Sequence, residues 1–395
     1  KLTMINQTVL RKYFLLFVVL IVTSCAGNSC SSNTFTDNAT KNGDLKHTDK
    51  ASNHSTKIED PASLYFSGDI STEVHQRMAS AFSLIQERLG KYPTEVYVLG
   101  TNQEEKDNLA SVYCQNRENA GDIGLKSEYK NKQDCLSFIN RPDHGFGHYL
   151  EKGLEAEVRG AECTIGAGHN GQIQMNFHLL VWSKPMGYND LQSPGYNCEF
   201  SLVFHEYWHV FQIAHTDPFI CQGEGTEKNC RFDGQLQEKL LGGVWLQEGT
   251  AVYRQHTFQE EQFKIGNMQN SDTTLAQILH NKYISGQQAM KECPGISLEN
   301  ISYTDPCSQA AYDWGAWAAA YLAYKVGDPY IFENKYYPTL KLTKDEILAF
   351  ESTFGYSRQE FFEEFNAWIY SPENERNKVI PIAQEGTGKL YYNFD

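Results

Sequence analysis

The strongest chemical signal in the chain is a pair of histidines that flank a glutamate in the segment HEYWH at 205–209. On a helix, His205 and His209 would lie one turn apart on the same side, where their imidazole rings can share one zinc ion. Glu206 follows the first histidine and could reach a water molecule at the metal without binding the metal itself. Unless the pattern is a coincidence, it predicts a Zn²⁺ site that carries its own general base.

The residues around this segment predict a helix over about 199–214. Apolar side chains recur there at helical spacing and would form one core-facing stripe: Val203, Tyr207, Val210, Phe211 and Ala214. His205 and His209 would face away from this main stripe. Because a shared metal requires both rings on one side of a helix, the context favours a true site over a chance match.

A catalytic zinc ion usually has three protein ligands and one position open to water, so a third ligand is needed. One candidate is His215, because HEYWHVFQIAH has its third histidine where the metzincin family has one. Metzincins break the helix with a glycine midway, however, and Gln212 stands at that position here. If the helix continues, His215 lies about 9 Å further along its axis than His209 and could not share the ion. This metzincin-like ligand set is kept as the alternative.

The other candidate is Glu248, in the segment GVWLQEGTAVY at 243–253. This segment closely resembles the second zinc helix of the gluzincin metallopeptidases, in which a W-L-x-E-G-x-A pattern delivers the third ligand. The resemblance implies that Glu248 completes the ligand set. A carboxylate between Trp245 and Ala251 would be costly to bury unless it were paired or bound to a cation, which agrees with that role. Gly249 beside it would let the two helices approach closely.

The segment AYDWGA at 311–316 extends the resemblance. It is similar to the Y-x-x-G helix of aminopeptidase-like gluzincins, which implies that the Tyr312 hydroxyl stabilises an oxyanion; an ordinary core tyrosine is the alternative. Residues 354–368 resemble the closing helix of bacterial gluzincin-like domains, so the resemblance covers about 199–370. The G-x-M-E-N strand by which aminopeptidases read a free amino terminus is missing, which favours an endopeptidase.

The elements that must position these residues predict an α+β fold. Helical periodicity over 72–90 stops at Gly90, 94–99 alternates as a strand, and 172–182 is the best strand candidate, predicted to be an edge strand. Between the two strands the chain reads as less regular. Further helices are expected at about 243–257, 308–326, 343–351 and 357–370. The resemblance implies a zincin-like domain with a sheet-containing lobe at 61–198, a helical zinc-binding lobe at 199–372, an active-site cleft between them, and a C-terminal tail at 373–395.

The N-terminal segment predicts export and a lipid anchor. Residues 1–25 place basic residues before a short apolar run and small residues, which is the order of a secretory signal. The run ends in Val-Thr-Ser-Cys, which resembles the bacterial lipobox and implies that Cys25 carries lipid; an ordinary cleaved signal is the alternative. Residues 26–60 are polar and predict a disordered tether. We therefore expect a cell-envelope protein attached to the membrane through Cys25.

The composition bears on the binding partners of the protein, and the cysteines bear on its disulfides. The 395-residue chain is globular in composition with a formal net charge of -15, which argues against binding nucleic acid through its surface. With Cys25 lipidated and one more cysteine in the tether, eight cysteines remain, an even set that suggests disulfides in an exported chain. Cys221 with Cys230, and Cys293 with Cys307, would close short loops and are the favoured pairs, although the complete pattern stays open. Nothing in the sequence indicates an oligomeric state.

Together these features predict zinc-dependent hydrolysis of peptide bonds in a peptide or protein substrate. His205, His209 and Glu248 would hold Zn²⁺, and Glu206 would act as the general base. The strand at 172–182 precedes the zinc helix and would pair with an extended substrate. Two alternatives remain: a non-catalytic surface or assembly lipoprotein with the same fold, and hydrolysis of a non-peptide substrate at the same site.

Overall fold

The computed structural model describes residues 58–60, 62–92, 94–119, 130–142, 145–159, 167–171, 178–182, 198–216, 219–222, 229–232, 234–268 and 273–394. The predicted signal segment, Cys25 and the tether up to residue 57 lie outside these ranges, as do residues 172–177 of the predicted edge strand. Within them the fold is predominantly helical with small sheets, as broadly expected. Among the described helices, none combines the length and the apolar character needed to cross a membrane.

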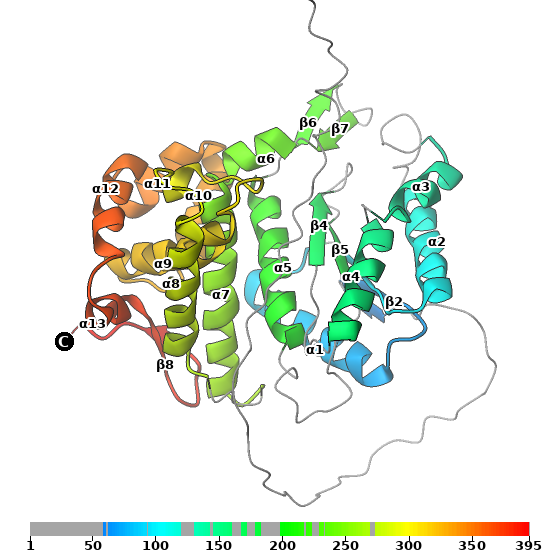
Figure 1. The fold of residues 1–395 in the computed structure, drawn as a ribbon, viewed down its shortest axis with the longest axis horizontal. Coiled ribbons are helices and arrows are strands. Elements are labelled where there is room, and N and C mark those ends of the chain that lie inside the picture. Colours follow the sequence, from blue (N-terminus) through cyan, green and yellow to red (C-terminus); the bar gives the residue numbers. More distant parts are fainter. Residues whose placement is uncertain are drawn as a thin grey trace, which may run out of the picture.

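A five-stranded sheet forms the N-terminal part of the structure (Figure 1). Its strands, in spatial order, are β1 (Ile58–Asp60), β2 (Ala62–Phe66), β3 (Thr94–Val98), β5 (His178–Trp182) and β4 (Ala167–Gly171). The three central strands run parallel, while β1 and β4 pair antiparallel at the two ends. The strand predicted at 94–99 is thereby confirmed.

Two expectations about this sheet are wrong. Residues 58–60 form β1 and do not belong to the tether. The described half of the strand predicted at 172–182 is β5, which pairs with β3 on one side and with β4 on the other, so it is not an edge strand. The apolar run HLLVW suits an interior strand, whereas the end position falls to β4, whose AGHNG sequence carries almost no strand signal.

Helix α1 (Thr72–Leu89) confirms the first predicted helix. It begins at Ser71, whose side chain accepts a hydrogen bond from Val74 N, and it ends at Gly90, where φ is 97°. The predicted apolar positions are buried, and through them α1 packs against the helix that carries the two histidines. This contact ties the sheet region to the candidate site.

The two strands whose side chains are described, β2 and β3, are buried on both faces. Alternate side chains of a strand point to opposite faces: Leu64, Phe66, Val96 and Val98 join the main core, whereas Tyr65, Tyr97 and Leu99 join a second core. The second core is covered by α2 (Gln103–Asn119), α3 (Lys132–Ile139) and α4 (Gly145–Arg159), and Cys114–Cys135 joins the first two. This stretch was expected to be less regular; Lys106 and Arg117 are buried on α2 and obscure its apolar face in the sequence.

The C-terminal part is built of helices that share the main core with the sheet (Figure 1). They are α5 (Cys198–Thr216), α6 (Gly234–Leu240), α7 (Val244–Lys264), α8 (Leu275–Met290), α9 (Gln309–Val326), α10 (Tyr337–Thr343), α11 (Glu346–Phe354), α12 (Arg358–Trp368) and α13 (Glu373–Arg376). Shorter turns lie at Leu298–Asn300, Phe332–Tyr336 and Asn377–Val379. Every helix predicted after residue 198 has a counterpart, while α6, α8, α10 and α13 were not predicted.

Two small hairpins complete the described structure. β6 (Phe219–Gln222) pairs with β7 (Asn229–Phe232) in a register that sets Cys221 opposite Cys230 in the backbone. β8 (Ile382–Ala383) and β9 (Leu390–Tyr391) lie in the predicted tail, which folds back so that Gly386 N donates to Lys264 O at 3.0 Å. Of the two favoured disulfides, Cys293–Cys307 is present.

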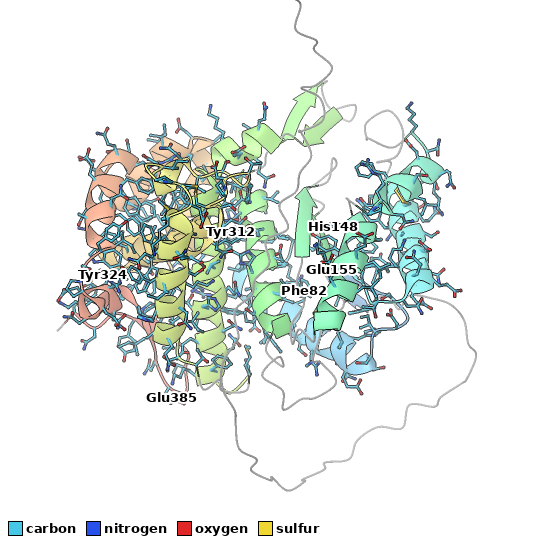
Figure 2. The ribbon with its side chains drawn as sticks, viewed as in Figure 1. Phe82, His148, Glu155, Tyr312, Tyr324 and Glu385 are labelled. Atoms are coloured by element: carbon cyan, nitrogen blue, oxygen red, sulfur yellow. A yellow bond between two sulfur atoms is a disulfide. The ribbon has the colours of Figure 1, made fainter. Side chains whose placement is uncertain are left out.

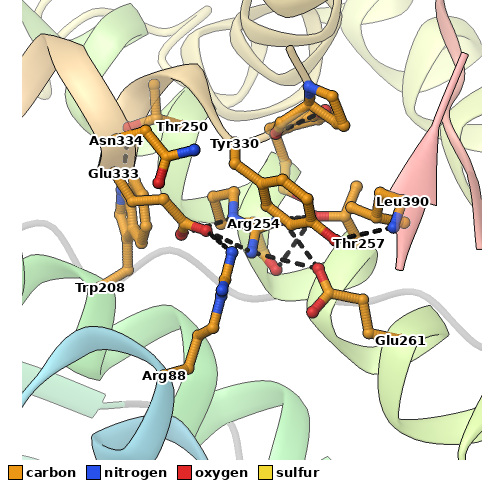
Figure 3. Close-up of polar contacts among 12 residues, drawn as sticks. Arg88, Trp208, Thr250, Arg254, Thr257, Glu261, Tyr330, Glu333, Asn334 and Leu390 are labelled. Atoms are coloured by element: carbon orange, nitrogen blue, oxygen red, sulfur yellow. Dashed lines mark hydrogen bonds and ion pairs between the residues drawn. The ribbon is translucent and has the colours of Figure 1, made fainter. Parts of the chain in front are cut away.

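A buried ion cluster links α1 to the C-terminal helices (Figure 3). Arg254 on α7 is 3% exposed and lies 3.3 Å from both Glu261 and Glu333. Arg88 from α1 also pairs with Glu333, and the Tyr330 ring lies against both guanidinium groups. Two arginines and two glutamates balance in charge, so the cluster fixes α1 against α7 without leaving an unpaired buried ion.

Candidate metal centre

Three candidate metal ligands converge between α5 and α7. His205 Nε2 and His209 Nε2 lie 3.1 Å apart, and Glu248 Oε2 lies 3.3 Å and 3.2 Å from them. Tetrahedral zinc binds nitrogen and oxygen at about 2.0–2.1 Å, which separates ligand atoms by roughly 3.4 Å. The three atoms therefore stand at the spacing of a zinc triad. No second group of this kind occurs among the residues that the structure describes.

The triad is buried, and its charges depend on one another. His209 and Glu248 are 2% and 4% exposed. Burial alone would lower the pKa of His209, but the Glu248 carboxylate raises it to about 9. Burial would likewise raise the pKa of Glu248, but His209 and His205 hold it well below its usual range. The buried Glu248 carboxylate faces the Nε2 atoms of both histidines, so a positive charge is needed between the three groups. A divalent cation would supply this charge and would bind one lone pair from each group.

Gln212 orients the His209 ring. Its Oε1 lies 2.7 Å from His209 Nδ1, and its Nε2 donates to the Gln247 carbonyl oxygen at 3.0 Å. Because a carbonyl oxygen can only accept, the Gln212 amide cannot be flipped, and Nδ1 must be the donor to Oε1. In the neutral form of the ring the lone pair of His209 is then on Nε2, toward Glu248, which is the tautomer that a metal ligand needs.

A second glutamine holds His205 in the same way. His205 Nδ1 lies 3.0 Å from Gln255 Oε1, and Gln255 Nε2 donates to Ser201 Oγ. Gln255 lies on α7 and Ser201 on α5, so this chain of contacts fixes the ring relative to the helix that carries Glu248. Both histidines thus have amide acceptors at Nδ1 and leave Nε2 for the shared position.

Close packing of α7 places Glu248 in the triad. On one side, Trp208 Nε1 donates to Thr250 Oγ1 at 3.0 Å and links α5 to α7. On the other side, Gly249 faces Gly315 on α9, and a Cβ added to Gly249 would meet the Gly315 backbone at 2.3 Å. The expectation that Gly249 serves the contact between the two zinc-bearing helices is therefore wrong. The close approach is between α7 and α9, because both helices carry glycine at the crossing point.

Glu206, the predicted base, is buried beside the triad at 7% exposure. Burial and then the charge of Glu206 raise the pKa of Tyr149 on α4. Burial, then the charges of Glu248 and Glu206, raise the pKa of Tyr312 on α9. The Glu206 carboxylate is thus close enough to act on side chains from both neighbouring helices, and its charge also contributes to the raised pKa of His209.

Tyr312 lies on α9 among the C-terminal helices (Figure 2). Its ring centroid is 6.4 Å from that of His205, and the two planes differ by 12°. The raised pKa keeps its hydroxyl protonated at neutral pH, so it is available as a hydrogen-bond donor next to Glu248. The structure therefore brings the predicted oxyanion donor to the triad.

Tyr303 is a member of the site that the sequence analysis missed. Its hydroxyl donates to Glu248 Oε1 at 2.5 Å. The residue lies in the loop before α9, outside any helix or strand pattern, so no periodicity marks it. Its position between Cys293 and Cys307, nine residues before Tyr312, was the one signal available in the sequence.

His215 does not join the other two histidines. Its Nδ1 lies 2.8 Å from the Phe211 carbonyl oxygen, one turn back along α5. Its ring packs 4.2 Å from the Phe211 ring and 6.5 Å from the Tyr337 ring. Because α5 continues unbroken through residue 216, the geometry groups the histidine pair with Glu248 and leaves His215 in an aromatic cluster.

No known protein family, curated protein or solved structure matches this chain. The residues of the site, and not a relative, must therefore carry any conclusion about function.

Proposed function

We propose that this protein is a zinc-dependent peptidase of the gluzincin type, with a zincin-like fold and an active-site cleft between the sheet region and the helices. The observation that carries the proposal is the convergence of His205 Nε2, His209 Nε2 and Glu248 Oε2 within 3.1–3.3 Å of one another. Glu206 beside this triad supplies the second requirement of hydrolysis, a base that is not a ligand.

Each residue of the site has one role in the proposed reaction. His205, His209 and Glu248 would hold Zn²⁺, which when bound supplies Lewis acidity and an acidified water. Glu206 would take the proton of the attacking water and later pass it to the leaving amine. The Tyr312 hydroxyl would donate a hydrogen bond to the oxygen that becomes negative during attack on the peptide carbonyl.

The end strand of the sheet offers a place for an extended peptide. Among the strands that the structure describes, β4 has a neighbour on one side only, and it lies beside α5, the helix of the histidine pair (Figure 1). A peptide that added to this edge would be held through backbone hydrogen bonds, which suits substrates of varied sequence. This role replaces the one expected of the strand at 172–182. We further propose that a lipid on Cys25 holds the enzyme in the cell envelope.

A non-catalytic metal-binding lipoprotein is the second candidate. It would need the triad and the two glutamines, since these alone suffice to hold a cation. It would not need a base directly after the first ligand, whereas hydrolysis does. The presence of Glu206 next to His205 therefore favours the enzyme.

Cleavage of an unbiased peptide library by the zinc-loaded protein tests the proposal. We expect endoproteolytic products that disappear with a chelator and return with zinc. Glu206→Gln should keep stoichiometric zinc and lose cleavage by a factor of about 100 or more, since it removes the general base. Zinc binding without any cleavage by the wild type would favour the non-catalytic lipoprotein, and full activity of Glu206→Gln would end the proposed mechanism.

A further inference from the structure

The two carboxylate oxygens of Glu248 have different neighbours. Oε2 lies 3.3 Å from His205 Nε2 and 3.2 Å from His209 Nε2, at the position where the three ligand atoms converge. Oε1 instead accepts a hydrogen bond from the Tyr303 hydroxyl at 2.5 Å. One oxygen is thus directed to the histidines and the other is occupied by a donor from a different segment of the chain.

Tyr303 lies in a loop that a disulfide and local hydrogen bonds hold in place. The disulfide Cys293–Cys307 closes this loop at its base. Within it, Ser302 donates from both its backbone N and its Oγ to Asp305 Oδ2, at 2.7 Å and 2.9 Å. The turn around Tyr303 is therefore fixed by its neighbours, and the hydroxyl does not have to be ordered anew when a metal binds.

We propose that Tyr303 is a positioning residue that makes Glu248 a one-oxygen ligand of the metal. By holding Oε1, it keeps the carboxylate from rotating to bind through both oxygens. A carboxylate that bound through both would fill a second coordination position, and a catalytic zinc site needs that position for water. The inference rests on the proposed metal site and deepens it, since it assigns a role to a residue that the peptidase reaction does not itself require.

The hydroxyl of Tyr303 is suited to this role. An ionised carboxylate can only accept, so the Tyr303 hydroxyl is the donor in its 2.5 Å hydrogen bond to Glu248 Oε1. Hydrogen bonds from an outer residue to a ligand typically change metal affinity by about 10–100-fold. An effect of that size is measurable without any substrate.

The test is Tyr303→Phe, which removes the hydroxyl and keeps the ring. Zinc affinity is measured by competition with a chromogenic chelator, and the visible spectrum is recorded with Co²⁺ in place of zinc. We expect zinc to bind roughly 10–100-fold more weakly. We also expect the intense absorption of four-coordinate Co²⁺ to weaken as Glu248 rotates and the coordination number rises. Neither readout depends on catalysis.

Tyr321→Phe is the matched control. The Tyr321 hydroxyl donates to Glu364 Oε1 at 2.6 Å, the same kind of hydrogen bond, here between the C-terminal half of α9 and α12. This variant should keep the zinc affinity and the Co²⁺ spectrum of the wild type, which separates the specific effect from the general loss of a tyrosine–glutamate bond.

Two results would overturn the inference. If Tyr303→Phe binds zinc and Co²⁺ as the wild type does, Glu248 does not depend on Tyr303. If its metal binding is unchanged while kcat alone falls, Tyr303 acts on the substrate and not on Glu248. The proposed peptidase function fails separately, when the wild type binds zinc but cleaves no peptide; a wild type that binds no zinc would remove both proposals.

Discussion

Gln212 offers the sharpest test of how the metal centre is built. Its side chain is fully buried and contacts four groups: His209 Nδ1 at 2.7 Å, Gln247 O at 3.0 Å, Thr250 Oγ1 at 3.0 Å and Tyr337 OH at 2.6 Å. Gln212→Leu removes these contacts with little change in volume, so the core stays filled. The variant should therefore isolate the polar role of this residue.

The expected loss of stability follows from the hydrogen bonds that the neighbouring groups keep in the variant. Thr250 Oγ1 and Tyr337 OH still lie 3.2 Å apart and can bond to each other, and Thr250 Oγ1 also keeps the Leu246 carbonyl at 2.8 Å. The Nδ1–H group of His209 loses the acceptor that Gln212 supplied. The loss of one partner from a buried hydrogen bond costs about 1–3 kcal/mol. Loss of the ring's acceptor should also weaken zinc binding by roughly 10–100-fold.

Two measurements check this expectation: zinc affinity by chelator competition, and the free energy of unfolding of the metal-free protein in urea. Gln259→Leu is the control, because Gln259 Oε1 lies 3.1 Å from His256 Nδ1 at the same three-residue spacing on α7. The control should lose stability and keep its zinc affinity. If Gln212→Leu binds zinc as tightly as the wild type, the orientation of His209 does not depend on Gln212 and the reasoning fails.

Three further predictions concern the third ligand, the helix crossing and acid stability. Glu248→Ala should lose most bound zinc and His215→Ala should not, as measured by metal content after purification; the reverse would support the metzincin-like ligand set. Gly315→Ala would set a Cβ 2.6 Å from the Trp245 carbonyl oxygen, so we expect the free energy of unfolding in urea to fall by about 1–3 kcal/mol, and an unchanged value would contradict the close crossing. Burial lowers the pKa of His256 to about 3, so its contribution to stability is complete above the unfolded value of 6.5 and is lost as the pH falls toward 3. His256→Asn should therefore flatten the loss of stability over this range in urea titrations, and a loss as steep as that of the wild type would exclude His256 as its source.

The sequence allowed accurate prediction of elements whose signals are local. Helix α1 has a capping serine, an apolar stripe and a terminal glycine, and it was placed almost to the residue. The helix of the histidine pair was recognised by its apolar spacing and the HEYWH motif, and the helix of Glu248 by the WLQEGTA segment. The grouping of Glu248 with the histidines was implied by the resemblance to the second zinc helix of gluzincins, and the cost of burying a lone carboxylate agreed with it.

Other features depend on contacts between distant segments, which local patterns do not encode. The end strand β4 has a sequence without strand propensity and owes its conformation to pairing with β5. Helix α2 was missed because Arg117 is buried, and it is buried because Glu95 on β3 pairs with it. Tyr303 was missed because its role depends on a loop that reaches Glu248 only in the folded chain.

Gln212 supports one conclusion, that His215 is not the third ligand, in two different ways. In the sequence, Gln212 stands where metzincins have a helix-breaking glycine, and this replacement argued against His215 as a ligand. In the structure the same side chain fixes the tautomer of His209, so it helps to build the site that excludes His215. The two effects are linked by geometry: an unbroken α5 carries Gln212 to the Nδ1 side of His209, and it carries His215 away from the triad. Helix continuity at this residue therefore determines both how the histidine pair is oriented and which third ligand it can share.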